Sequence, residues 1–116
     1  MTTLRNSVQL IGRLGMDPET KTFSDNKSKV RFSLATSEYY NNKDGERQEE
    51  TQWHNIVAFG KTAEIAEKYL KKGKEIAVSG KLTYRSWEDK EGHTNYITEV
   101  VANEVQMLGK KEDSSN

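Results

Sequence analysis

Residues 51–73 limit the possible folds most, because the hydrophobic period changes within this stretch from two residues to nearly four. In its first half the side chains alternate, so that Trp53 and Phe59 point to one side of the chain and His54 points to the other. In its second half apolar residues recur four positions apart, which is the spacing of one face of a helix. The stretch therefore predicts a strand that continues directly into a short helix.

The predicted helix has an apolar stripe and a defined end. Two pairs of residues four apart form the stripe, Ile65 with Tyr69 and Ala66 with Leu70. Gly73 follows two lysines, and this combination is typical of a helix C-terminus, because glycine accepts the left-handed conformation and cations favour that end of the helix dipole.

Alternating hydrophobicity predicts further strands at residues 6–14, 29–37, 74–87 and 94–105, and a brief edge pairing at 20–23. The polar run at 41–50 is expected to be a hairpin tip or a loop. The resulting order has five main strands, with one helix between the third and the fourth. This is the order of an OB-fold, an all-β, five-stranded Greek-key barrel that commonly binds oligonucleotides or oligosaccharides.

The composition limits the chain to one small domain without disulfides. It has 116 residues, 33% of them hydrophobic, and no cysteine, which excludes a disulfide framework and a thiolate zinc site. A core this lean would gain from self-association. The apolar runs are too short to cross a membrane and the N-terminus lacks a secretory signal, so a cytoplasmic protein is expected. We expect an OB-fold domain at 1–108 and a loosely held tail at 109–116.

Aromatic rings beside cations are the feature of the sequence that carries chemistry. Trp53 and Phe59 share one strand face, and Trp87 shares a strand face with Lys81 and Arg85. Flat rings stack on nucleobases with little regard for base sequence, and cations neutralise phosphates. The formal net charge of zero argues against a surface that is basic throughout, but it allows a basic groove.

The alternative for each ring is a place in the core. For Trp53, alternation alone does not decide which strand face is buried, whereas the charged neighbours of Trp87 favour exposure. Three other rings share faces with aliphatic residues and are expected inside: Phe32, Tyr69 and Tyr84.

Neither a catalytic nor a metal-binding arrangement is evident in the sequence. Gly60-Lys61-Thr62 follows a strand and precedes a helix, as a P-loop would, but Asn55 stands where the first glycine of that motif belongs. Lys61 is therefore interpreted as a phosphate contact at one end of the barrel. His54 and His93 are the only histidines, and neither begins a metal-ligand motif. We expect no enzymatic activity, no metal and no cofactor.

Several separate motifs, in the same order over residues 4–109, resemble the bacterial single-stranded DNA-binding protein family. They are Leu10-Ile-Gly-Arg-Leu-Gly-Met-Asp-Pro-Glu, Leu34-Ala-Thr-Ser-Glu, Thr51-Gln-Trp-His, Phe59-Gly-Lys-Thr-Ala-Glu, Tyr69-Leu-Lys-Lys-Gly, Gly80-Lys-Leu and Met107-Leu-Gly. The resemblance implies an OB-fold, a homotetramer as the usual assembly (with a dimer as the alternative), and sequence-independent binding of single-stranded DNA in replication, recombination and repair.

The resemblance also implies roles for individual positions. Bases would stack on the aromatic residues Trp53, Trp87, Phe59 and Tyr40. At position 40 relatives often have a tryptophan, and tyrosine offers less stacking area. Cations along the implied DNA path are Lys61, Lys72 and Arg85, to which the strand pattern adds Lys81. His54 matches a position associated with subunit assembly.

The chain departs from the family pattern in two places. Ser7 and Asn55 stand where relatives often have a basic residue, which implies a less charged DNA path. Relatives usually continue through a long linker to an acidic tip that recruits other replication and repair proteins, whereas this sequence stops at Asp113-Ser-Ser-Asn, so recruitment through such a tip is not expected. The rival interpretations are a primosomal type of protein-interaction adaptor and a catalytic barrel such as a nuclease.

Overall fold

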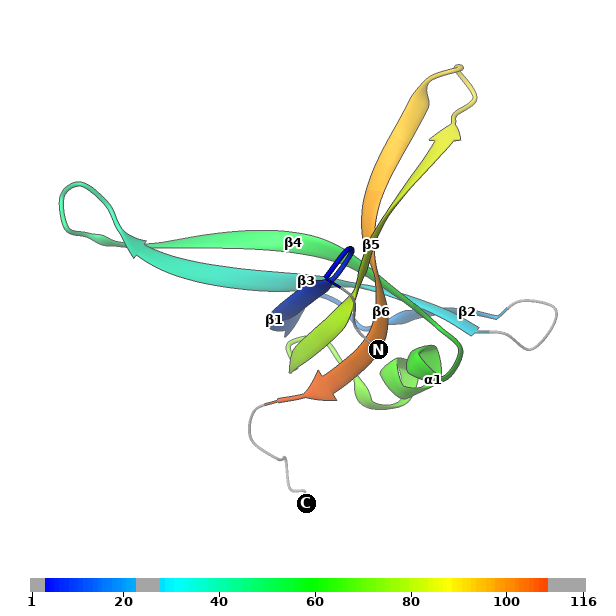
Figure 1. Cartoon of the computed structure of the whole chain (residues 1–116), viewed down its shortest axis with the longest axis horizontal. Helices are drawn as coiled ribbons and strands as arrows, with labels where there is room; N and C mark the ends of the chain where they lie inside the picture. The colour runs from blue at the N-terminus through cyan, green and yellow to red at the C-terminus, as the bar shows by residue number, and fades with distance from the viewer. Residues whose placement is uncertain (1–3, 23–27, 109–116) are drawn as a thin grey trace.

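Six strands and one helix make up the computed structural model, which describes residues 4–22 and 28–108 (Figure 1). In chain order they are β1 (Val8–Leu14), β2 (Glu19–Thr22), β3 (Ser28–Asn41), β4 (Arg47–Phe59), α1 (Gly60–Tyr69), β5 (Glu75–Glu88) and β6 (Thr94–Met107). The predicted order is confirmed, and the predicted edge pairing is the short β2. Phe23 and the tail predicted at 109–116 lie outside the described residues.

The strands form one sheet in the order β1-β5-β6-β4-β3-β2. β1 also pairs with β3, where Arg13 and Leu14 lie opposite Ala35 and Leu34, and this second pairing closes the sheet into a barrel. β4 and β6 are parallel, whereas the other pairs are antiparallel. The architecture is the five-stranded OB-fold barrel predicted from the sequence, with β2 added at its edge.

Two glycines permit the tight curvature of the barrel. A Cβ atom at Gly12 would overlap the carbonyl oxygen of Ala35, where β1 crosses β3. A Cβ atom at Gly80 would overlap the carbonyl oxygen of Val101, next to a bulge in the β5–β6 ladder. Strands can approach each other this closely only where one of them has no side chain.

The core fills the barrel and the space beneath α1. Its buried members are Leu14, Val30, Phe32, Leu34, Ile56, Ala58, Ala63, Ala66, Leu70, Ile76, Val78, Val100 and Ala102. The expectation that Phe32 lies in the core is confirmed, since its side chain is 1% exposed. Within the described residues no helix is long and apolar enough to span a membrane.

The sequence predicted two pairs of residues in the apolar stripe of α1, and the prediction is wrong for one of these pairs. α1 packs against β3, β4 and β6 with Ala63 and Ala66 buried, and Leu70, which follows the last residue of α1, is buried as well. Ile65 and Tyr69 are 46% and 45% exposed, so the expectation that Tyr69 lies in the core is also wrong. The reason is that small alanines bring the helix close to the barrel, and the neighbouring row of side chains then lies outside the contact.

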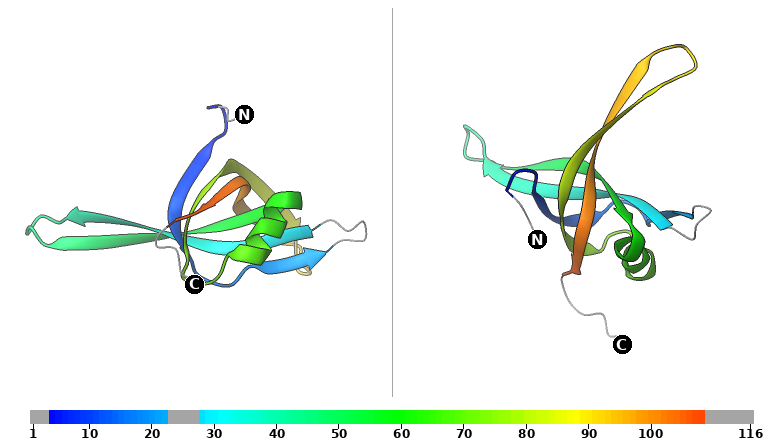
Figure 2. Two further views of the ribbon diagram at one scale, coloured as in Figure 1. Left: turned by 90° about the horizontal axis from the view of Figure 1, so that it is seen from below. Right: turned by 45° about the vertical axis from the view of Figure 1, so that its right-hand side comes forward.

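Two hairpins extend beyond the barrel as long arms (Figures 1 and 2). β3 and β4 pair continuously from Lys29 opposite Phe59 to Asn41 opposite Arg47. The strand predicted at 29–37 is therefore longer, and much of the loop predicted at 41–50 is strand. Tyr84 lies on the β5–β6 arm and is 72% exposed, so its predicted place in the core is wrong because β5 has left the barrel there.

Candidate nucleic-acid interface

Strand pairing places the aromatic and cationic residues of several strands on one exterior face of the barrel. A row of directly paired residues crosses four strands, with Arg31 opposite Val57, Val57 opposite Val101, and Val101 opposite Lys81. Paired residues point to the same side of a sheet, and so do residues two apart along a strand. We call this side the outer face, and its members include Lys29, Arg31, Trp53, Phe59, Glu99, Lys81, Arg85 and Trp87.

The position of Trp53, which alternation left open, is on the surface. Its side chain is 62% exposed, at the point where β4 leaves the barrel. Its ring occupies the space next to Gly15, where a Cβ atom would overlap Cζ3 of the indole and lie 2.8 Å from Cη2. The missing side chain at Gly15 therefore lets the indole lie close to the barrel while one side stays open to solvent.

Phe59 and Trp87 are the other two exposed rings of the outer face. Phe59 ends β4 at 49% exposure, with Nζ of Lys29 5.9 Å from its ring centroid, which is within the range of a cation–π interaction.

Trp87 is 50% exposed near the end of the β5–β6 arm. The adjoining turn is ordered by Asp89, whose Oδ1 accepts hydrogen bonds from the backbone N–H groups of Glu91 and His93. The bond from His93 is the main reason why the pKa of Asp89 is lowered.

Tyr40 is 53% exposed, but it points to the side of the β3–β4 arm opposite to Trp53. Its neighbour Tyr39 shares the side of Trp53, and the guanidinium of Arg47 lies 4.5 Å from the Tyr39 ring centroid. Sequence reasoning did not select Tyr39. Alternation alone could not have found it, because the choice between Tyr39 and Tyr40 depends on the register in which Ala35 lies opposite Trp53.

The predicted backbone cations fall into two groups. Lys81 and Arg85 lie on β5 within the outer face, whereas Lys61 lies on α1 and Lys72 in the segment that follows α1. All four side chains are exposed, but the structure brings only the first two together with the rings of the sheet. Lys29 and Arg31 of β3, which sequence reasoning did not select, join the same face.

Arg85 forms a bidentate ion pair with Glu99. Its Nε donates to Oε1 of Glu99 at 2.8 Å and its Nη2 donates to Oε2 at 2.9 Å. Glu99 is only 3% exposed, and the hydrogen bonds from Arg85 hold the pKa of this carboxyl below its ordinary value despite burial. The same hydrogen bonds raise the pKa of the Arg85 guanidinium.

His54 is half-buried on the side of β4 opposite to Trp53, and its Nε2 lies 2.9 Å from Oγ1 of Thr36. This confirms its predicted orientation, while its role in subunit assembly stays a prediction. His93 lies in the turn of the β5–β6 arm, with Nδ1 3.7 Å from Oδ2 of Asp89. In residues 4–22 and 28–108, no three His, Cys, Asp or Glu side chains cluster closely enough to hold a metal ion.

The chain matches a known family. A family model described as the single-strand binding protein family matches residues 5–108. The chain belongs to the single-strand binding protein family. Single-stranded DNA-binding protein 1 of Xylella fastidiosa is 48% identical over 111 residues, which cover 95% of this chain and 82% of that protein. Single-stranded DNA-binding protein 1 of Chlorobaculum tepidum is 49% identical over 108 residues, which cover 92% of this chain and 67% of that protein.

A solved structure supports the same family assignment. It is described as a Plasmodium falciparum SSB complex with ssDNA, and it matches with a TM-score of 0.83 at 30% identity, covering 94% of this chain and 98% of that chain. The resemblance found in the sequence motifs and the predicted OB-fold are thereby confirmed.

Proposed function

We propose that this chain binds single-stranded DNA without sequence preference, as a non-enzymatic protein of replication, recombination and repair. Bases stack on Trp53, Phe59 and Trp87, and cations of the same face neutralise phosphates. The observation that carries this proposal is the outer face itself, where three large rings are 49–62% exposed beside cations from neighbouring strands. Rings exposed together in this way are typical of a binding surface. The cytoplasmic location predicted from the sequence is part of the proposal.

The test is a titration of the protein with oligo-dT, followed by tryptophan fluorescence and by gel retardation. Emission is expected to fall on binding, because bases stack on both indoles. Removing one ring with Trp53→Ala or Trp87→Ala is expected to weaken binding by about 1–3 kcal/mol, the usual value of one base–aromatic stack. Tyr84→Ala is the matched control, since Tyr84 is exposed on the other side of β5 and should leave the affinity unchanged. Unchanged emission with no retarded band at low salt would refute the proposal.

The proposed DNA path also includes three residues that the sequence resemblance implies: Tyr40, Lys61 and Lys72. Tyr40→Ala and Tyr39→Ala, compared in the same titration, show which side of the β3–β4 arm the DNA follows. A larger loss for Tyr39→Ala would place the DNA on the side of Trp53 only. A larger loss for Tyr40→Ala would place it around the arm.

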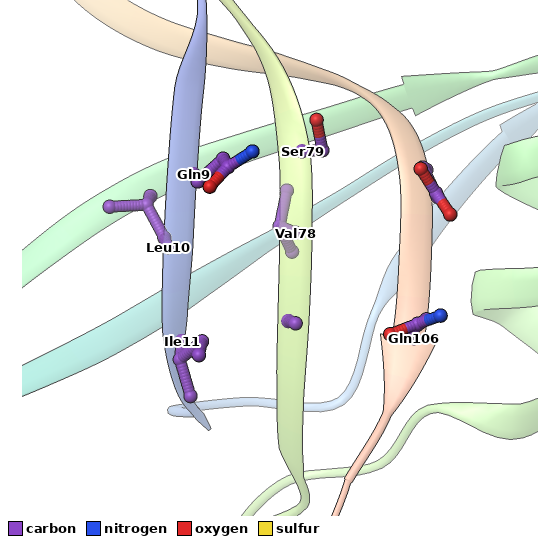
Figure 3. A pocket seen from close by; sticks show the side chains of 8 residues that line it. Gln9, Leu10, Ile11, Val78, Ser79 and Gln106 are labelled. Carbon is purple, nitrogen blue, oxygen red and sulfur yellow. The ribbon is translucent and has the colours of Figure 1, made fainter.

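We also propose that the chain assembles with copies of itself. The barrel exterior over β1, β5 and the end of β6 forms a second surface, the assembly face, made of Gln9, Ile11, Ala77, Ser79, Glu104 and Gln106 (Figure 3). Only one of these six side chains is charged, although 31% of the whole sequence is. Ile11, on the outermost strand β1 of this face, is 61% exposed. A sheet face with so few charged side chains suits contact with a second copy.

A second feature supports four copies rather than two. β1 pairs with β3 only through Arg13 and Leu14, so the edge of β1 over residues 8–12 has no strand partner within the described part of the chain. The open edge and the assembly face can form two different symmetric contacts, which are sufficient for a homotetramer, whereas a dimer would use one of them.

Light scattering tests the assembly. The mass of four chains is expected, and Ile11→Glu is expected to lower it, because a carboxylate would be buried in the contact. Ile65→Glu is the control, since Ile65 is also exposed but lies on α1. A His54→Ala variant, measured in the same way, tests the assembly role predicted for His54. A single-chain mass for the unaltered protein would refute the assembly proposal and leave DNA binding untouched.

A further inference from the structure

We propose that the DNA backbone crosses the outer face through a groove between β2, β3 and β5, in which Lys21, Lys29, Arg31 and Arg85 hold phosphates. We call it the cationic groove. This proposal rests on the proposed function and adds three residues, Lys21, Lys29 and Arg31, that the sequence did not single out. The groove has a volume of about 470 Å³, and its lining residues are Glu19, Thr20, Lys21, Lys29, Arg31 and Arg85.

The cations of the groove come from three separate strands and converge at one place. Lys21 of β2 lies directly opposite Lys29 of β3 in the ladder. Like charges in directly opposed positions destabilise a sheet, so the fold alone does not favour this pair. Neither lysine forms an ion pair with a carboxylate of residues 4–22 or 28–108. A bound anion would relieve their repulsion.

Two buried residues form the floor of this face. Val57 is 1% exposed, yet it lies outside the core cluster and points to the outer face, opposite Arg31. Glu99 is 3% exposed and also points outward, opposite Thr83. Long cationic side chains commonly bury their stems along the surface beneath them. Arg85 is one such side chain, because its guanidinium binds both oxygens of Glu99.

Glu99 fixes the orientation of Arg85 within the groove. Both oxygens of Glu99 accept hydrogen bonds from Arg85, through Nε and Nη2, while Nη1 has no hydrogen bond to any described residue. Lys29 and Arg31 also lower the pKa of Glu99 by their charge, which shows that the cations of β3 act on the same place. Four cations thus face two carboxylates, Glu19 and Glu99, and the groove keeps an excess of positive charge.

The groove continues directly into the proposed stacking surface. Lys29 lines the groove and its Nζ lies 5.9 Å from the centroid of the Phe59 ring, so one residue joins the phosphate path to the stacked base. At the other side, Arg85 is two residues before Trp87 on the same strand face. Stacking on rings with cations between them is the arrangement that binds unpaired strands without sequence preference.

The alternative is that the cations only stabilise the fold through ion pairs. It accounts for Arg31, which pairs with Glu19, and for Arg85, which pairs with Glu99. It does not account for Lys21 and Lys29. The experiment therefore changes these two lysines, because their replacement leaves both ion pairs intact.

The measurement is the salt dependence of oligo-dT binding for the full chain, with affinities taken from tryptophan fluorescence. Each phosphate contact that is lost reduces the slope of log K against log salt by about 0.7 for a single strand. The double variant Lys21→Gln/Lys29→Gln is expected to reduce the slope by about 1.4, and Lys29→Gln alone by about 0.7. The fluorescence quenching at saturation should stay unchanged, because the rings are intact. Lys43→Gln/Lys68→Gln removes the same charge from a hairpin tip and from α1 and should keep the original slope.

The outcomes separate the two proposals. An unchanged slope for both lysine variants, or an equal reduction in the Lys43→Gln/Lys68→Gln control, would overturn the cationic groove while DNA binding by the outer face stands. An unaltered protein that binds no oligo-dT at low salt would instead refute the proposed function.

Discussion

At the scale of single residues, Gly15 determines where the indole of Trp53 lies. A methyl group at position 15 would overlap the ring, and the ring can move because it is the end of a flexible side chain. Gly15→Ala is therefore expected to shift the emission of Trp53 and to weaken oligo-dT binding, while the melting temperature changes little. A Trp87→Phe background isolates the Trp53 signal.

Gly12→Ala is the contrasting control for this prediction. Its methyl group would overlap a backbone oxygen of Ala35, which cannot rotate away, so it should lower the melting temperature markedly. Equal emission spectra for Gly15→Ala and the unaltered protein would show that the ring does not depend on this glycine.

Glu99 makes the stability of the protein depend on pH in the acid range. Hydrogen bonds from Arg85 lower the pKa of Glu99 from its ordinary 4.5. The stabilisation is therefore fully present above pH 4.5 and is lost as the pH falls through the lower pKa of the folded protein. Urea unfolding between neutral pH and pH 3 should show a smaller loss of stability in Glu99→Gln than in the unaltered protein. Glu67→Gln, which changes an exposed carboxylate of α1, is the control and should retain the pH dependence of the unaltered protein.

Alternation predicted residue neighbours along one strand but not across strands. It placed Lys81, Arg85 and Trp87 on a common face, because side-chain direction follows from the backbone period. It could not predict that Arg85 pairs with Glu99, fourteen positions away, since that contact depends on the register of β5 against β6. Lys29 and Arg31 were missed for the same reason, because their places beside Phe59 and Arg85 depend on strand register and strand order.

At the scale of elements, α1 packs on the barrel through one row of small side chains, while the adjacent row is exposed. Ala66 is fully buried against the barrel, so Ala66→Leu is expected to overpack the contact and lower the free energy of unfolding by about 1–3 kcal/mol. Ile65→Ala removes a larger side chain from the adjacent exposed row and should change stability by only about 0.5 kcal/mol. Urea unfolding curves of the two variants measure this difference, and a larger loss for Ile65→Ala would contradict the observed packing.

The arms are the elements that the sequence predicted least well. Residues 38–41 and 47–50 are mostly polar and show no buried side, so their hydrophobicity resembles that of a loop. They are strands because each residue pairs with a partner on the neighbouring strand, as in Tyr39 opposite Glu49. Hydrophobic alternation detects a strand only where one side is buried, and the arms extend beyond the region where a core exists.

At the scale of the whole molecule, the proposed DNA surface and the proposed assembly face occupy different parts of the barrel exterior. The first extends over β2, β3, β4 and the outer part of β5, whereas the second covers β1 and the β5 and β6 segments next to it (Figures 1 and 3). Copies that associate through the assembly face therefore keep their outer faces free for DNA, and one strand can pass from copy to copy.

This separation predicts that assembly changes affinity only for long DNA. Ile11→Glu leaves every ring and cation of the outer face in place, so an oligo-dT of about 10 nucleotides, within the site of a single OB-fold, should bind with unchanged affinity. An oligonucleotide several times longer occupies several outer faces of one assembly, and each later contact is then intramolecular. The variant, once single-chain by light scattering, should bind the long strand about 100-fold more weakly or worse. Fluorescence titrations with both lengths measure the contrast. If the single-chain variant kept the affinity for the long strand, the copies would bind DNA independently, and assembly would need another explanation.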